Sequence, residues 1–178
     1  MNILPIKDVD GNIYHPVKIG SQIWLKENLK VTHYINGDQI TMITDNYQWT
    51  SPNGGAYFGN ISTNGRLYNW FVVQSNRVCP KGWHVPSMIE LKKLVEFLGG
   101  ENTACSQLAN LVDVGNAEEI CYNGVPSNKG HWWSSTKEQY SAWSLCFIYS
   151  ASCSAGITCD NPENNVLCGF YIKCIKNE

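Results

Sequence analysis

Cysteine is the residue type in this sequence with the widest capacity for chemistry. The cysteines are Cys79, Cys105, Cys121, Cys146, Cys153, Cys159, Cys168 and Cys174. No two of them have the C-x-x-C spacing that is typical of zinc knuckles and thioredoxin-like redox motifs. Eight cysteines are more than a cytosolic protein usually carries, and in a secreted chain they would ordinarily form a disulfide framework.

The histidines offer no catalytic or metal-binding pattern. They are His15, His33, His84 and His131, and none has a second ligand at metal-site spacing. We expect His84, inside the run Gly-Trp-His-Val-Pro, to be a packed structural residue instead of a general base. No Ser or Cys lies in a nucleophile motif such as G-x-S-x-G. The sequence therefore predicts no enzyme, no metal and no cofactor.

Charge and hydropathy exclude two further classes of partner. The net charge is −2 and the pI about 6.1, whereas nucleic-acid binding needs clustered Lys and Arg. No run approaches the roughly 18 apolar residues of a membrane span. Residues 1–17 lack the apolar stretch of a signal peptide. We therefore expect either a cytosolic protein that acts after assembly or lysis, or an exported one whose signal is absent from this chain.

The order of predicted elements is strands, helices, strands. Turn signals at residues 10–12, 20–21 and 36–38 separate short apolar segments in the first third, and residues 45–65 have the composition of a long loop. After Gly130 the residues alternate with period 2, in residues 143–148 and again in 170–174, which places one set toward the core and the other toward solvent. The pattern predicts a single α+β domain over residues 1–178.

Helical signals lie in the middle of the chain. Residues 87–98 carry the clearest one: Ser87 and Glu90 make a capping box, an apolar stripe of helical period follows, and Gly99 and Gly100 end it. A short helix is predicted over residues 65–74 and a weaker one over 102–111.

Several motifs together resemble one family. They are DVDGNIY at residues 8–14, IGSQIWLKENL at 19–29, GRLYNW at 65–70, CPKGWHVP at 79–86, WWSST at 132–136 and GFYIKC at 169–174. In this order they resemble the Fibrobacter succinogenes major paralogous domain, which is common in Bacteroidetes and their phages. That family is in turn similar to the C-type lectin fold and its formylglycine-generating-enzyme-like branch.

The resemblance implies a C-type-lectin-like α+β fold. It implies two main helices, a small antiparallel sheet, and a final strand that closes this sheet near the N-terminus. It also implies that Cys79 and Cys174 pair in an oxidising environment, and that Trp132 and Trp133 pack in the core and at a sheet edge instead of stacking on a sugar. It implies no established enzymatic activity.

The composition of residues 144–161 suggests a diversified surface. This stretch lacks Lys, Glu, Gln, Met and Trp, the five residues that codons ending in a pyrimidine cannot encode. Diversity-generating retroelements mutate adenines in Asn-type codons and so produce every residue except these five. Their target proteins carry C-type-lectin-like domains with the variable stretch at the C-terminus, which the candidate segment 140–168 resembles. An ordinary disulfide-bearing loop of chance composition is the alternative.

In this hypothesis, inward side chains hold the strand register while outward ones change freely. The scaffold would be Trp143, Leu145, Phe147, Phe170 and Ile172. The solvent-facing, ligand-binding positions would be Tyr140, Ser144, Cys146, Ile148, Tyr149, Ser150, Ser152, Cys153, Thr158, Asp160, Leu167 and Cys168. Cys146, Cys153, Cys159 and Cys168 would then be accidental thiols.

Residues 160–165 concentrate oxygen ligands and faintly resemble the sugar-binding loop of calcium-dependent lectins. The order of residues differs from that motif, so a polar turn between strands is the favoured interpretation.

The leading functional hypothesis is recognition, without catalysis, of a protein or glycan ligand on a cell or virion surface by a variable protein. The alternatives are an invariant structural or adhesive module of a Bacteroidetes surface lipoprotein, and a cryptic enzyme of the formylglycine-generating-like branch. The sequence indicates neither the ligand nor the oligomeric state.

Overall fold

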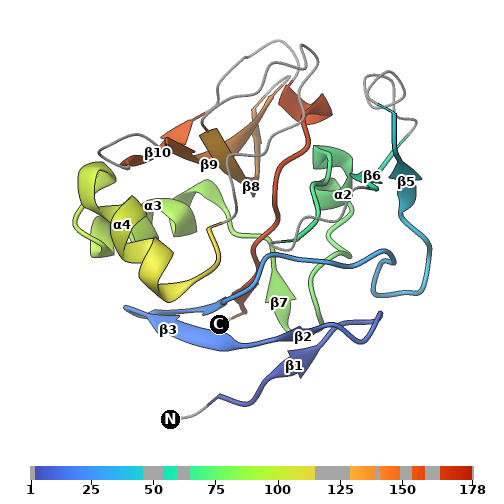
Figure 1. Cartoon of the computed structure of the whole chain (residues 1–178), viewed down its shortest axis with the longest axis horizontal. Coiled ribbons are helices and arrows are strands. Elements are labelled where there is room, and N and C mark those ends of the chain that lie inside the picture. Colours follow the sequence, from blue (N-terminus) through green and yellow to red (C-terminus); the bar gives the residue numbers. More distant parts are fainter. Residues whose placement is uncertain are drawn as a thin grey trace.

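The computed structural model of the protein describes residues 3–45, 54–59, 65–114, 129–138, 141–148, 154–158 and 165–177. The chain is α+β, with helices between two groups of strands (Figure 1). The helices are α2 (Trp70–Gln74), α3 (Met88–Phe97), α4 (Glu101–Leu111) and the 3-10 helix η1 (Asn165–Leu167). The strands are β1 (Ile6–Lys7), β2 (Ile13–Tyr14), β3 (Pro16–Ile19), β4 (Gln22–Leu25), β5 (Thr41–Ile43), β6 (Ala56–Phe58), β7 (Trp83–His84), β8 (Lys129–Glu138), β9 (Ser141–Ile148), β10 (Ser154–Thr158) and β11 (Ile175–Lys176).

Antiparallel pairing dominates the sheets of the described ranges. One sheet has the order β10-β9-β8 and another the order β3-β4-β11-β7, while β1 pairs with β2. β5 and β6 pair in parallel. In the second sheet Ile175 of β11 lies opposite Trp24 of β4 and His84 of β7. The last strand thus closes a sheet beside the N-terminal strands, as the resemblance implies.

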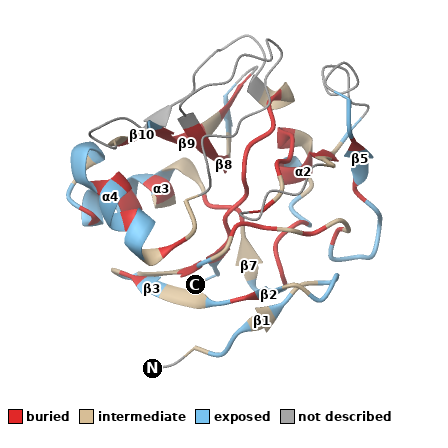
Figure 2. Ribbon diagram, in the orientation of Figure 1, coloured by how far each residue is buried: buried red, intermediate tan, exposed pale blue. Residues whose placement is uncertain are grey.

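Residues 168–176 form a central C-terminal segment that runs through the middle of the molecule (Figures 1 and 2). Every residue from 168 to 175 is buried. Backbone hydrogen bonds tie the segment to the parts of the chain on both sides of it, because buried N–H and C=O groups must find partners. The bonded partners are Tyr68 for Phe170, His131 and Trp133 for Tyr171, Leu29 for Ile172 and Leu25 for Cys174.

The two neighbouring tryptophans of β8 belong to different apolar cores. Trp132 packs edge-on against Phe147, in the core that contains the buried faces of α3 and α4. Trp133 packs against Phe170 in the other core and donates from its indole N–H to the Tyr68 carbonyl at 2.7 Å. Successive residues of a strand point to opposite faces, so β8 is covered on both faces. Both rings are buried, as expected, and neither is a platform for a sugar.

The predicted helix at residues 87–98 is confirmed. Ser87 and Glu90 form the complete capping box, and the last helical residue is Phe97. Ile89 is the exception in its apolar stripe, since its side chain is 61% exposed. The helix expected over residues 102–111 is also present as α4.

The other predicted helix is shorter than expected. α2 begins at Trp70, with Asn69 as its cap, whereas the sequence predicts a start near residue 65. The reason lies in a distant partner: Tyr68 is extended and exchanges two backbone hydrogen bonds with Phe170. The loop expected over residues 45–65 also contains the short strand β6 in its described part.

The prediction that Tyr171 and Lys173 face solvent is wrong. Both side chains are fully buried, because the central C-terminal segment lies between two cores and has no solvent side. The ammonium group of Lys173 donates to the Lys26 carbonyl and lies 5.1 Å from the centre of the Trp132 ring. Burial lowers the pKa of Lys173 to about 7, against the opposing attraction of Asp113 and Glu27.

Lys173 should make the free energy of unfolding depend on pH between neutral and alkaline values. Its pKa falls from 10.5 in the free side chain to about 7 in the fold, so the unfolded chain binds more protons between these two values. Stability therefore rises with pH across that window, and the cost of burying the charge is greatest below pH 7. We expect Lys173→Met to remove this rise and to stabilise the protein by ~1–4 kcal/mol below about pH 7.

Urea unfolding of both proteins from about pH 6 to about pH 10 measures the effect. Lys176→Met is the matched control, since Lys176 is exposed and lies three residues further along the same segment. Its pH dependence should equal that of the wild type. The same slope in Lys173→Met and wild type would contradict a buried charge.

Candidate binding surface

Strand β9 carries the first predicted ligand-binding positions, and the prediction that they face solvent is wrong for two of them. Ser144 is 1% exposed and Cys146 is 5% exposed. Leu145 and Phe147, expected as scaffold, are fully buried on the opposite face. The strand is therefore packed on both sides, whereas period-2 alternation predicts one wet side.

The register of the sheet shows what covers Ser144 and Cys146. Cys146 lies opposite His131 of β8, and Ser144 lies opposite Trp133. The His131 ring stacks on Phe170 with centroids 4.3 Å apart, and its Nδ1 lies 3.1 Å from the Ser144 hydroxyl. Side chains from the central C-terminal segment thus close this face, so a larger residue at Ser144 or Cys146 would have to displace its neighbours.

Cys168 is a third predicted surface position that the structure contradicts. Its side chain is 5% exposed and belongs to the same core as Trp133 and Phe170. It is also disulfide-bonded, as is Cys105 of α4. Cys168 is therefore part of an oxidised framework and not an accidental thiol. Cys146 is a buried thiol.

The disulfide that the resemblance implies is present. Cys79 and Cys174 are joined across a sequence separation of 95 residues. Cys174 lies in the central C-terminal segment and Cys79 in the chain before β7, so the bond fixes the end of the chain to the middle of the sequence. The sequence did not predict the disulfide bond of Cys168, because the spacing of cysteines alone does not reveal which of them pair.

Ile148, Ser154 and Gly156 form the accessible end of the covered face, and we call them the sheet rim. Register places Ser154 opposite Ile148, and Gly156 opposite Cys146, on the same face of the sheet. Ile148 is 37% exposed, and Ser154 and Gly156 are partly exposed. Of the predicted surface positions, Ile148 and the half-buried Leu167 of η1 are the ones whose side chains reach solvent in the described part of the chain.

The remaining predicted positions lie outside the described residues. They are Tyr140, Tyr149, Ser150, Ser152, Cys153 and Asp160. Thr158 ends β10 opposite Ser144, with only its backbone described. The oxygen-rich residues 160–164 also lie outside the described ranges.

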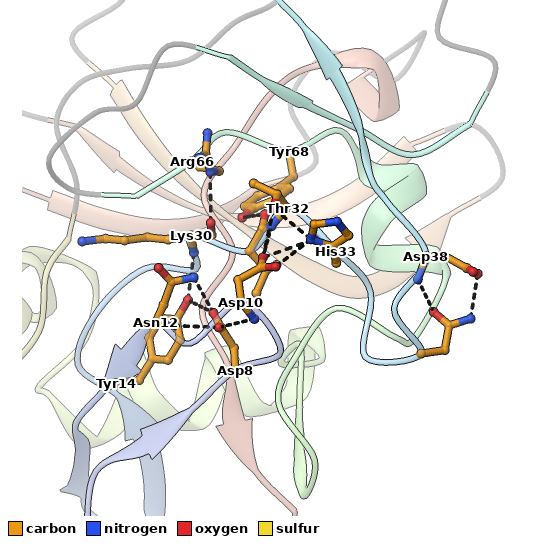
Figure 3. Close-up of polar contacts among 12 residues, drawn as sticks. Asp8, Asp10, Asn12, Tyr14, Lys30, Thr32, His33, Asp38, Arg66 and Tyr68 are labelled. Atoms are coloured by element: carbon orange, nitrogen blue, oxygen red, sulfur yellow. Dashed lines mark hydrogen bonds and ion pairs between the residues drawn. The ribbon is translucent and has the colours of Figure 1, made fainter.

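An acidic network near the N-terminus was not anticipated from the sequence, which shows only a turn there (Figure 3). Asp8 accepts from the backbone N–H groups of Asp10 and Asn12 at 2.9 Å and from the Tyr14 hydroxyl at 2.7 Å. Asp10 accepts from the backbone and hydroxyl of Thr32. The side chains attach the β1–β2 hairpin to the segment before β5.

His33 completes this network. Its Nδ1 lies 2.6 Å from Asp10, whose side chain is 18% exposed. Burial alone raises the pKa of Asp10, but the hydrogen bonds from Thr32 and His33 outweigh that effect and the pKa is lowered. The carboxylates face donors of the protein itself. The network is therefore a structural clamp, and in the described ranges no three His, Cys, Asp or Glu side chains are grouped so as to hold a metal ion.

His84 is not packed as expected, since its side chain is 40% exposed, but both of its ring nitrogens have partners. One ring nitrogen lies 2.9 Å from the Glu90 carboxylate and the other 2.7 Å from the Asn177 side-chain oxygen. The ring therefore links the capping box of α3 to the end of the chain.

Comparison with known proteins gives one match. The model of the Fibrobacter succinogenes major domain matches residues 17–124, more than half of the chain. No curated protein and no solved structure matches significantly. The matched range ends before β8, so the sheet rim lies beyond it. None of the helices in the described ranges has the length and apolar character needed to cross a lipid bilayer.

The acidic clamp should stabilise the fold at neutral pH. We expect Asp10→Asn to lower the free energy of unfolding by ~1–2 kcal/mol at pH 7, because the amide cannot accept all of the hydrogen bonds. A lowered carboxyl pKa contributes stability above its unfolded value of about 3.9, and this contribution is lost as pH falls through the folded value. The difference between wild type and Asp10→Asn should therefore shrink below about pH 4.

Urea unfolding at several pH values measures this difference. Asp38→Asn is the control, since its carboxylate is 62% exposed and pairs with Arg77 at the surface. That exposed pair should contribute less than about 1 kcal/mol. Equal losses in both variants would mean that Asp10 is no more than a surface charge.

Substitution by arginine should affect stability very differently at Cys146, in the core, and at Ile148, at the sheet rim. Cys146→Arg places a charge in a closed core and should cost several kcal/mol, enough to abolish cooperative folding. Ile148→Arg at the rim should change stability by no more than about 1 kcal/mol. Thermal unfolding followed by circular dichroism measures both, and a folded, stable Cys146→Arg protein would show that this face is open.

Proposed function

The chain belongs to the Fibrobacter succinogenes major domain family, and we propose that it is a non-catalytic binding protein that recognises a protein or glycan on a cell or virion surface. We further propose that it has a C-type-lectin-like fold. The pairing of β11 with β4, beside two main helices, supports that fold.

The observation that carries the binding proposal is the sheet rim. Ile148 presents a partly exposed apolar side chain at the end of a strand whose preceding residues are locked in the core. Ser154 and Gly156 lie on the same face and are partly exposed. A rigid support lowers the entropy lost on binding, and apolar groups beside small polar ones are common in recognition surfaces.

The disulfides support an oxidising compartment. Cys79 and Cys174 are joined, and Cys105 and Cys168 are also oxidised. Such bonds persist in exported proteins and on virion surfaces, and are rare in the cytosol of most organisms. We therefore propose that the protein acts outside the cytoplasm. The same oxidation gives no support to a formylglycine-generating-like enzyme, which needs a pair of cysteine thiols for its metal.

The hypothesis of a diversified surface now covers fewer positions. Ser144, Cys146 and Cys168 are core or disulfide positions, so we withdraw them from the variable set. Within the described residues the set retains Ile148, Leu167 and Thr158, the last of which has only its backbone described. The positions outside the described ranges stay predictions.

An invariant adhesive module is the second candidate, and the closed face of β9 favours it. Ser144 and Cys146 are held in a packed core, so in this candidate their residue types are determined by packing and not by retroelement mutagenesis. Sequencing copies of the gene from close strains separates the two candidates. Diversification requires variation at Ile148 and Leu167 with a nearby reverse transcriptase and template repeat, whereas constancy at both positions would leave the invariant module.

Binding at the rim is testable with labelled protein on a glycan array and on intact bacterial cells. We expect Ile148→Arg to weaken binding about tenfold or more, because a charge would replace an apolar contact. Ile89→Arg is the control, since Ile89 is 61% exposed on α3, away from the rim. It should change affinity less than about twofold. Equal binding by wild type and Ile148→Arg would exclude the rim as the contact surface.

A further inference from the structure

A polar groove lies between α3, the β3–β4 turn and β11, apart from the sheet rim. Its volume is about 240 Å³, and its lining includes Gln22, Glu90, Lys93, Lys176 and Asn177. This is slightly smaller than the ~300–1,000 Å³ of pockets for drug-sized ligands. The space suits a single small molecule.

Hydrogen bonds between its walls hold the groove in shape. The Gln22 amide donates to the Glu90 carbonyl at 3.0 Å, joining β4 to α3. His84 lies between the Glu90 carboxylate and the Asn177 side chain. The Asn177 backbone N–H donates to the Gly82 carbonyl at 3.0 Å. A preformed site binds with a smaller loss of conformational entropy than one that must be ordered by its ligand.

The groove is lined by one carboxylate and two ammonium groups, and the carboxylate of Glu90 already accepts hydrogen bonds from the protein. Both oxygens of Glu90 are engaged, one by His84 at 2.9 Å and the other by the backbone N–H and hydroxyl of Ser87 at 2.7 Å. Lys93 and Lys176 are exposed and form no ion pair with any residue in the described ranges. Two ammonium groups from different elements therefore line one small cavity, and together they exceed the single negative charge of Glu90.

The remaining lining residues could bind the hydroxyl groups of a ligand and contact its apolar surface. Ser21, Gln22 and Asn177 supply a hydroxyl and two amides, and the adjoining Ile23 and Ile175 supply apolar surface. We propose that this groove binds a small sugar acid, with its carboxylate between Lys93 and Lys176 and its hydroxyls on the amide side chains. The site is independent of the sheet rim, so either can fail without the other.

A titration of the isotope-labelled protein with sodium glucuronate, followed by amide NMR shifts, tests the proposal. We expect saturable shifts at Gln22, Lys93 and Asn177. Glucose, which lacks the carboxylate, should cause no saturable shift there. Acetate, which lacks the hydroxyls, should bind more weakly. Sodium chloride keeps the ionic strength equal in all samples, because exposed charges are screened by salt.

Two lysines on one helix provide the matched variants. Lys92 and Lys93 are both exposed on α3, but only Lys93 lines the groove. Lys93→Ala and Lys176→Ala should each raise the Kd about two- to fivefold, and the double variant about tenfold, as expected for partly exposed ion pairs. Lys92→Ala should leave the Kd within about twofold. Lys93→Arg, which keeps the charge, should retain binding.

Three results would overturn the proposal. They are no saturable shift with glucuronate, equal affinity for acetate and glucuronate, and equal effects of Lys92→Ala and Lys93→Ala. The dispersion of the NMR spectrum shows in the same samples whether each variant is folded.

Discussion

Burial of the central C-terminal segment is the constraint on which the other elements depend. Residues 168–175 have no exposed side chain, so each backbone polar group there needs a protein partner. Those partners come from segments as far apart in sequence as Leu25, Tyr68 and His131. The strands near the N-terminus, α2 and the β8–β10 sheet are thus organised around the end of the chain, and the Cys79–Cys174 disulfide fixes this arrangement covalently.

This constraint explains why a surface expected on β9 is closed. An antiparallel sheet ordinarily has one wet face, and the sequence pattern of β9 agrees with that expectation. Here Phe170 reaches across to His131 and Trp133 and covers the second face. The accessible part of that face is reduced to the sheet rim, where Ile148 and Ser154 lie beyond the covering side chains.

Elements determined by local interactions were predictable from the sequence, and those determined by distant contacts were not. The capping box of Ser87 and Glu90 lies within one helical turn, so α3 is where the sequence places it. By contrast, α2 starts late because Tyr68 pairs with Phe170, about a hundred residues away. Lys173 follows a period-2 pattern that indicates solvent, and only the tertiary arrangement shows it beside Trp132. The same holds for the acidic clamp, whose partners Thr32 and His33 are remote from Asp10.

The range of the family match and the packing of the cores together indicate which residues can be substituted without loss of the fold. The match ends at residue 124, yet β4 and β7, both in the matched range, are joined in one sheet through β11, near the end of the chain. The matched part therefore cannot complete its sheet or its cores without residues 168–176. A change at the buried residues 168–175 or beneath them acts on the whole fold, because packed cores tolerate little change in volume or charge. Ile148, whose side chain leaves the core, is a position where a substitution changes the surface without changing that packing.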